Sequence, residues 1–171
     1  EAYDEASYCI SLIRDYQITY PVAFDWELDG DYDSVTEACE TFCNVISSYG
    51  YQPMVYSNRN RWYNNFDGEK IASKYKVWMA AYFGKFYYDS VRWTYGDDLP
   101  NFRYHYDMWQ YSSRCYVDGI SGQVDVDIAF FGYANYHVDT KDAVLTVTNK
   151  EIKRTNGLDD YIFFFNNSEK N

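Results

Sequence analysis

Apolar residues recur at two different spacings along the chain, and each spacing predicts a different element. Near the N-terminus they lie three or four positions apart, at Ala6, Cys9, Ile10 and Ile13. Residues at this spacing share one face of a helix, so an amphipathic helix is predicted over residues 2–16. A second helix is predicted over residues 34–49. Its start has the capping-box spacing of Ser34 and Glu37, and Gly50 follows where a C-terminal cap belongs.

Short apolar runs supply the predicted strands, at residues 22–26, 53–57, 77–82, 107–112 and 127–131. Pro21 ends any helix before the first run. The first two runs flank the second helix directly. This strand–helix–strand order predicts parallel strands joined by a helix, because parallel neighbours need a crossover connection. The pattern therefore favours an α/β fold with a parallel sheet.

The pattern of apolar and polar residues along the chain changes near Tyr136. Residues 143–149 alternate apolar and polar positions like a half-exposed strand, and residues 161–165 form another apolar run. We therefore predict a boundary near residues 136–140. Residues 1–136 would form one α/β domain, and residues 137–171 would be a linker and the start of a β-rich accessory domain.

Charge and composition narrow the range of partners. The 171-residue chain carries a formal net charge of −11, which disfavours nucleic acids and anionic lipid surfaces because both are negatively charged. No apolar run approaches the ~20 residues that cross a membrane. Aromatic residues make up 22% of the chain, with 21 Tyr and 5 Trp. Such side chains can stack on sugars, but they can equally fill a core.

The four cysteines leave two interpretations open. An even count fits an oxidising compartment. The two predicted helices should pack side by side, so one prediction is a disulfide between Cys9 and either Cys39 or Cys43. The alternative is that all four cysteines are small buried apolar residues. No Cys-x-x-Cys pair exists and both histidines are distant from the cysteines in sequence, so no zinc site is predicted.

Two carboxylates flank a tryptophan at the end of the first predicted strand, in the segment PVAFDWELDG. Asp25 and Glu27 should face one side of the extended chain, with Trp26 facing the other. The same spacing recurs at Asp125 and Asp127, so spacing alone is also compatible with a strand that simply ends in water. Position favours function, because the carboxyl ends of parallel strands form the ligand-binding edge of α/β proteins. Paired carboxylates there can divide the roles needed for glycoside cleavage.

Five segments occur in an order that resembles the family 25 glycoside hydrolases: PVAFDWE, YQPMVYSN, VWMAAY, MWQYSS and GISGQVDVDIAFFG. Members of this family are lysozymes, N-acetylmuramidases that cut peptidoglycan on a modified α/β barrel. The resemblance covers residues 1–136 and implies a partial (β/α) barrel as the catalytic domain. It further implies peptidoglycan glycan strands as the substrate, a secreted monomer and no cofactor.

The resemblance also implies roles for single residues. Glu27 corresponds to the general acid of the family and Asp25 to its partner carboxylate, while Asp125 matches an acid of the active-site cleft. A general acid must hold a proton near neutral pH, which repulsion from Asp25 and Asp125 would promote. The positions that resemble the family's sugar-contacting groove are Tyr56, Trp78, Tyr82, Trp109 and Gln110. The alternatives are core packing for the two tryptophans and a solvated loop for Asp125.

The sequence departs from the family at its start. Members open with a strand that carries an Asp, followed by two more strand–helix units. Only residues 1–24 precede Asp25 here, and they correspond to the third helix of the family. The resemblance therefore implies that about three strands are absent, which would leave the strand before Asp25 with an unpaired side. We expect either a fragment of a longer enzyme or a chain completed from elsewhere.

Three other functions remain open at this stage. A chitinase-type enzyme also ends a strand with DWE, but that motif needs another Asp where Ala23 stands. A non-catalytic module that binds cell-wall glycan would use the aromatic groove without needing Glu27. An inactive fragment of a muramidase would need neither the aromatic groove nor Glu27. Turnover of peptidoglycan, as opposed to binding alone, separates the enzyme from the glycan-binding module, and thermal melting of the chain tests the fragment.

Overall fold

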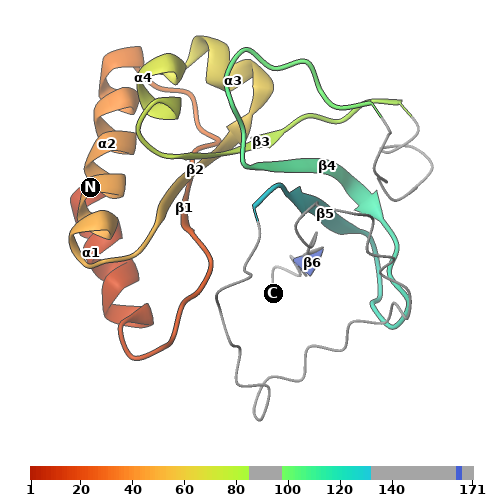
Figure 1. Cartoon of the computed structure of the whole chain (residues 1–171), viewed down its shortest axis with the longest axis horizontal. Helices are drawn as coiled ribbons and strands as arrows, with labels where there is room; N and C mark the ends of the chain where they lie inside the picture. The colour runs from red at the N-terminus through yellow and green to blue at the C-terminus, as the bar shows by residue number, and fades with distance from the viewer. Residues whose placement is uncertain (85–97, 132–164, 167–171) are drawn as a thin grey trace.

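Six strands form one sheet that curls into a half-barrel, and the helices cover its outer face (Figure 1). A computed structural model of the protein describes residues 1–84, 98–131 and 165–166. The strands lie side by side in chain order: β1 (Val22–Asp25), β2 (Pro53–Asn58), β3 (Lys76–Ala80), β4 (Met108–Cys115), β5 (Val124–Ala129) and β6 (Phe165–Asn166). The predicted α/β fold and partial barrel are therefore confirmed.

Strand direction changes halfway across the sheet. Strands β1 to β4 are parallel, as predicted, but β5 runs antiparallel to β4 and β6 antiparallel to β5. The prediction of a wholly parallel sheet is thus wrong for its last part. The 8-residue segment between Cys115 and Val124 is a tight connection, too short for the crossover that a parallel neighbour requires. As a result, the start of β5 lies at the same edge as the ends of β1 to β4.

Among the described residues, four helices accompany the strands: α1 (Ala2–Ile13), α2 (Tyr32–Ser48), α3 (Arg59–Asn64) and α4 (Gly68–Ala72). The two short helices α3 and α4 were not predicted. Helix α2 begins earlier than predicted because its N-cap is Asp31, whose carboxylate accepts hydrogen bonds from the backbone N and Oγ of Ser34. Ser34 is therefore inside the first turn, and the predicted capping box at Ser34 and Glu37 is wrong.

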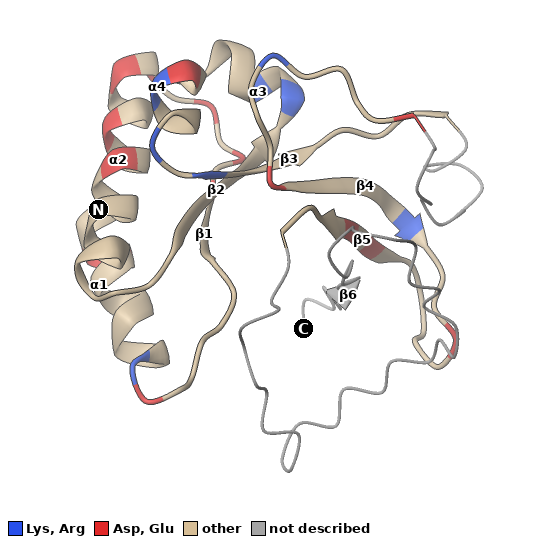
Figure 2. Cartoon of the chain, in the orientation of Figure 1, with Lys and Arg blue, Asp and Glu red and all other residues tan. Residues whose placement is uncertain are grey.

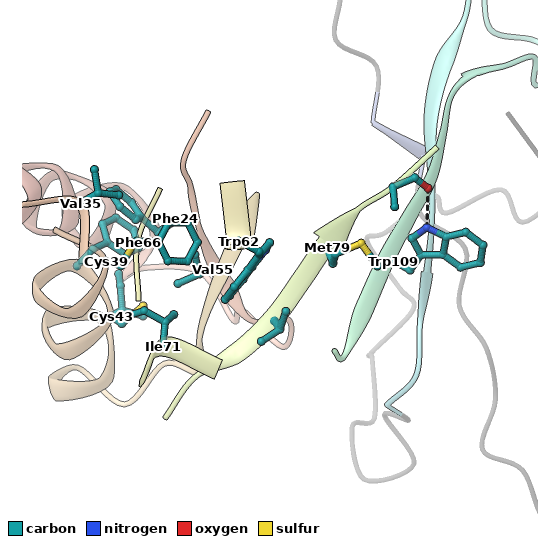
Figure 3. Packing of buried hydrophobic residues seen from close by; sticks show 14 of the residues in the cluster. Phe24, Val35, Cys39, Cys43, Val55, Trp62, Phe66, Ile71, Met79 and Trp109 are labelled. Carbon is teal, nitrogen blue, oxygen red and sulfur yellow. Dashed lines mark hydrogen bonds between the residues drawn. The ribbon is translucent and has the colours of Figure 1, made fainter. Parts of the chain in front are cut away.

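The main core lies between the sheet and the helices (Figure 3). Phe24 of β1 stacks on Phe42 of α2 with ring centroids 4.7 Å apart, and Trp62 of α3 meets Phe66 edge-on. Strands alternate their side chains, so every second strand residue enters this core: Phe24, Val55, Val77, Met79, Trp109, Tyr111, Val126 and Ile128. The intervening residues face the inner side of the curled sheet.

Three of the four cysteines take the second of the two predicted roles, as small buried residues, and Cys9 is only partly buried. All four are free, and Cys39, Cys43 and Cys115 are buried. The alternative prediction of a disulfide to Cys9 is wrong in this structure. Burial raises the pKa of the Cys39 thiol to about 12, so this group packs as a neutral apolar side chain.

Most of the C-terminal segment lies outside the described residues, including the predicted strand over 143–149. The end of the other predicted strand, 161–165, forms part of β6, which pairs with β5 in the same sheet. The division into a domain over 1–136 and an accessory segment over 137–171 stays a prediction. Within the described ranges, no helix has the length and apolar character needed to cross a bilayer.

Candidate active site

The segment that carries the first two acids is held rigidly at the end of β1. The backbone N–H of Trp26 donates to the carbonyl of Tyr56 at 3.0 Å, and the buried Ser57 Oγ donates to the carbonyl of Trp26 at 2.6 Å. These bonds extend the β1–β2 pairing past Asp25, so the alternation of the strand continues. Trp26 packs against the helix-facing core, while Asp25 and Glu27 lie on the inner side, where Glu27 is exposed and Asp25 is partly exposed and partly buried.

The loop after Glu27 is tied to α3. Arg61 Nη1 donates to the Leu28 carbonyl at 3.3 Å and to the Asp29 carboxylate at 2.9 Å. Glu27 is therefore flanked by an anchored peptide on each side, through Trp26 and Leu28. Fixed backbone on both sides restricts where its carboxyl can lie.

Asp125, near the start of β5, completes a cluster of three acids. Burial raises the pKa of Asp25, and the charge of Glu27 raises it further. The same two causes, in the same order, raise the pKa of Asp125. Glu27 therefore lies close enough to both aspartates to repel them, although Asp125 is about a hundred residues away along the chain. Glu27 is thus within electrostatic range of both aspartates; the catalytic roles of the three acids stay predictions.

Beside the acids, the inner face carries a hydrogen-bonded group of aromatic and amide side chains. The hydroxyl of Tyr56 donates to Gln110 Oε1 at 2.8 Å, and the hydroxyl of Tyr82 donates to the same oxygen. The indole of Trp78 meets the Tyr56 ring at a centroid distance of 4.7 Å. Its Nε1 donates to Asp127 Oδ1 at 2.7 Å. Four of the five predicted sugar-contacting residues thus form one connected group.

These residues differ in how they can meet a ligand. Tyr82 is 40% exposed, whereas Tyr56 and Gln110 are 8% and 5% exposed. Trp78 is partly exposed. Burial also raises the pKa of the Tyr82 hydroxyl to about 12 and that of Tyr56 above its usual range, so both phenols remain neutral hydrogen-bonding groups. Tyr82 and Trp78 therefore expose surface that a ligand can contact. The buried Gln110 holds Tyr82 by a hydrogen bond, and the buried Tyr56 packs against Trp78.

Trp109 does not belong to this group, and its predicted contact with sugar is wrong in this structure. It precedes Gln110 on β4, so its side chain faces the opposite side of the strand. It is fully buried, stacks on Phe83 at a centroid distance of 5.5 Å and donates from Nε1 to the Ala81 carbonyl at 2.9 Å (Figure 3). Core packing, the alternative considered for this residue, is what the structure contains.

Asp127 is a member of the inner face that the sequence analysis did not select. It lies two residues after Asp125 on β5, and Figure 2 shows this strand as an acidic stretch next to β4. The Asp-x-Asp spacing was visible in the sequence, and it places both side chains on one face of a strand. What the sequence could not reveal is that one of the two carboxyls is only 2% exposed.

The acids do not form a metal centre in the part of the chain that the structure describes, where no group of three His, Cys, Asp or Glu side chains is arranged to hold an ion. Three carboxyls beside a neutral, hydrogen-bonded aromatic surface can instead supply proton transfer and charge stabilisation to an uncharged polar ligand. Glycoside cleavage requires both of these.

Comparison with known proteins agrees with this chemistry. The sequence profile of Glycosyl hydrolases family 25 matches residues 1–120. Because this match spans most of the chain, the chain belongs to that family. The sequence is 31% identical over 123 residues to the lysozyme of Streptococcus phage Cp-1, and it is 29% identical over 128 residues to the D-alanyl-L-alanine endopeptidase of Streptococcus phage B30.

Solved structures show the same fold. The CTP1L endolysin is 28% identical, with a TM-score of 0.57 over 72% of this chain and 40% of that one. The catalytic domain of the endolysin ply40, from bacteriophage P40 of Listeria monocytogenes, is 21% identical, with a TM-score of 0.53 over 74% of this chain and 59% of that one. In the two phage relatives, the alignments cover 67% and 72% of this chain but only 32% and 27% of the relatives. The chain thus spans about a third of their length.

Proposed function

We propose that this chain carries the catalytic carboxylates of a muramidase, which hydrolyses the β-1,4 bond between N-acetylmuramic acid and N-acetylglucosamine in peptidoglycan. The observation that carries the proposal is the meeting of Asp25, Glu27 and Asp125 on one face, where burial and the charge of Glu27 raise the pKa of both aspartates. The family membership and the lysozyme name of a relative support the same substrate class.

The proposed division of labour follows from placement and charge. Glu27 is exposed at the end of an anchored segment, and it would donate a proton to the leaving glycosidic oxygen. Asp25, on the same face, would stabilise the positive charge that develops on the sugar ring in the transition state. Asp125 is within electrostatic range of Glu27, and its negative charge would favour a proton on the cluster.

Proton retention by the cluster has a simple electrostatic cause. Asp25 and Asp125, partly buried and repelled by the charge of Glu27, ionise less readily than isolated acids. The two aspartates therefore keep their protons at a higher pH than separate side chains would. A cluster that holds a proton near the scissile bond suits general acid catalysis.

A second candidate comes from the endopeptidase name of the phage B30 relative, which would imply peptide-bond cleavage. A thiol peptidase needs a thiolate beside an imidazole. Cys39, Cys43 and Cys115 are buried, and burial raises the pKa of the Cys9 thiol. His105 is instead near Asp107, at 3.7 Å. The carboxyl cluster therefore favours the glycosidase reading for this part of the chain.

The decisive experiment is digestion of purified peptidoglycan by the 171-residue chain, with two chemical readouts. New reducing ends report cleaved glycosidic bonds, and new free amines report cleaved peptide bonds. We expect reducing ends only, and we expect the Glu27→Gln variant to produce almost none while still sedimenting with peptidoglycan.

Two other results would reject the proposal. Sedimentation with peptidoglycan without either product would favour the glycan-binding module. Free amines without reducing ends would favour the peptidase. Because the substrate lies outside the cell membrane of bacteria, we further propose that the protein acts outside that membrane.

A further inference from the structure

Strand β4 changes its register against β5 twice, near the end of β4 that lies beside the acids. The first shift lies between Gln110 and Ser112, and the second between Ser112 and Cys115. Three pairs of facing residues bracket the shifts: Gln110 with Asp127, Ser112 with Val126, and Cys115 with Val124. From the first pair to the last, β4 advances five positions and β5 only three. Strand β4 therefore contains two β-bulges, each with one extra residue.

The first bulge decides which way Ser112 faces. Residues directly opposite each other in an antiparallel pair have their side chains on the same face of the sheet. Ser112 is opposite Val126, which belongs to the helix-facing core, and Ser112 is itself fully buried. Unbroken alternation from Gln110 on the inner face would instead have placed Ser112 on that face and Ser113 on the other. The bulge therefore reverses the sides of these two neighbouring serines.

Ser113 occupies the inner position that alternation would have given to Ser112. Asp125 is the single β5 residue between the second and third facing pairs, so Ser113 and Arg114 both lie opposite it. Ser113 is partly exposed. Burial raises the pKa of the Tyr82 hydroxyl to about 12, the charge of Asp125 raises it further, and the Ser113 side chain is among the groups that oppose the rise. Ser113 is therefore a neighbour of both Asp125 and Tyr82 on the inner face.

A hydroxyl at this position has the chemistry that a sugar requires. It can donate one hydrogen bond and accept others, whereas an ionised carboxylate such as Asp125 only accepts. The hydroxyl and N-acetyl groups of a glycan present donors and acceptors close together. Ser113 therefore adds a donor beside the acids, next to the exposed surface of Tyr82.

We propose that Ser113 is a glycan-binding residue of the inner face, and that the double bulge of β4 points its hydroxyl toward the ligand. This inference rests on the proposed function for the identity of the ligand. Its structural part is independent of that function: Ser113 faces the inner side, and Ser112 faces the core. The two adjacent serines thus form a matched pair, with the same chemistry on opposite faces of one strand.

Cysteine substitution tests which way the two serines face. Ser112→Cys and Ser113→Cys are made in the full chain together with Cys9→Ser, because Cys9 is partly exposed whereas the other native cysteines are buried. Labelling with iodoacetamide, followed by mass spectrometry, measures how fast each new thiol reacts. The thiol at position 113 should react at least about a hundredfold faster than the thiol at position 112, which is reached only when the structure opens locally.

Calorimetry tests the binding role, with all variants in a Glu27→Gln background so that the ligand stays intact. The ligand is a soluble tetrasaccharide of alternating N-acetylglucosamine and N-acetylmuramic acid. Ser113→Ala should weaken its binding by about twofold to tenfold, as expected for one lost hydrogen bond, whereas Ser113→Thr keeps the hydroxyl and should stay within about twofold of the parent. Saturating tetrasaccharide should also slow the labelling of position 113.

Ser112→Ala is the matched control. The Ser112 Oγ accepts the backbone N–H of Arg114 at 3.1 Å inside the protein. Its loss should lower the melting temperature, because a buried donor is left without its acceptor. The affinity for the tetrasaccharide should be unchanged.

Faster labelling at position 112 than at position 113 would overturn the proposal, because it would show that the serines are not reversed. Labelling at 113 that saturating glycan does not slow, or unchanged affinity of folded Ser113→Ala, would each remove the binding role. Ser113→Thr as weak as Ser113→Ala would assign the effect to packing.

If Ser113→Ala does not fold, protection of position 113 from labelling and the affinity of Ser113→Thr still decide. A parent chain that binds no glycan would reject the proposed function and the binding role together. The labelling rates would still show which serine faces the inner side.

Discussion

On its outer side, the sheet presents Phe24, Val55 and Trp109 to the helices; on its inner side, the same strands present Asp25, Tyr56 and Gln110. The outer residues are all nearly or fully buried and gain stability from dense packing with no directional requirement. On the inner side, Tyr56 and Gln110 are held by a hydrogen bond, and the charge of Glu27 repels Asp25. The comparison indicates that packing on the outer face stabilises the fold. The inner face carries polar and charged side chains whose mutual repulsion this packing offsets.

The largest expected effect on the inner face is that of Glu27→Gln. Glutamine keeps the shape and can donate a hydrogen bond, but it cannot transfer a proton to the leaving oxygen. Release of reducing ends from peptidoglycan should fall by about 10²–10⁴, and Asp25→Asn should also lower the rate. Trp26→Phe is the control. Because Trp26 faces the other side of the same strand, this substitution should change the stability of the protein more than its turnover. Near-normal turnover by folded Glu27→Gln would mean that the acids are only the solvated end of a strand.

On the outer face, Trp109→Ala should lower the free energy of unfolding by about 3–5 kcal/mol, because a fully buried indole leaves a cavity. Denaturation in urea measures this loss. The inner-face counterpart, Trp78→Phe, should instead weaken glycan binding more than stability. If Trp109→Ala were nearly as stable as the parent yet bound glycan poorly, the assignment of Trp109 to the core would be wrong.

Because Asp127 is a buried carboxyl on the inner face, it should make the stability of the folded protein depend on pH. Its pKa is raised from 3.8 to about 8, so between these values the folded state keeps a proton that the unfolded state releases. The stability linked to this group is complete below about pH 4 and is lost as the pH rises toward 8. The melting temperature of Asp127→Asn relative to the parent should therefore increase from pH 5 to pH 8. A constant offset between the two melting curves would contradict the raised pKa.

The smallest expected effect is that of Arg61→Lys, which concerns the loop beside Glu27. Lysine retains the charge but not the planar group that reaches both Leu28 and Asp29. Because Asp29 is exposed, the free energy of unfolding should change by less than about 1 kcal/mol. Turnover should fall by roughly threefold to tenfold through kcat rather than KM, since the loop orients the acid. A change confined to KM would show that Arg61 acts on glycan binding instead.

Local sequence patterns predicted the helices and strands with a strong periodicity of apolar residues. They missed the features that depend on a few specific contacts. Helix α2 was expected from its apolar face, yet its first turn depends on Asp31 rather than Ser34, because several acids near residue 30 could serve as caps. The short helix α4 begins at Gly68, where an added Cβ would lie 2.3 Å from the Trp62 carbonyl. That close approach between separate elements leaves no periodic signal in the sequence.

The sequence by itself determined the strand–helix order, the alternation that places Asp25 and Glu27 on one side, and the family resemblance that singled out Asp125. Only the tertiary structure decided that β5 turns back antiparallel, which brings Asp125 to Glu27. It also assigned Trp109 to the core and Trp78 to the inner face, and it buried Asp127 opposite Gln110 on the neighbouring strand. The physical reason is that periodicity fixes which residues share a face of one strand, whereas burial and pKa depend on the strands that pack beside it.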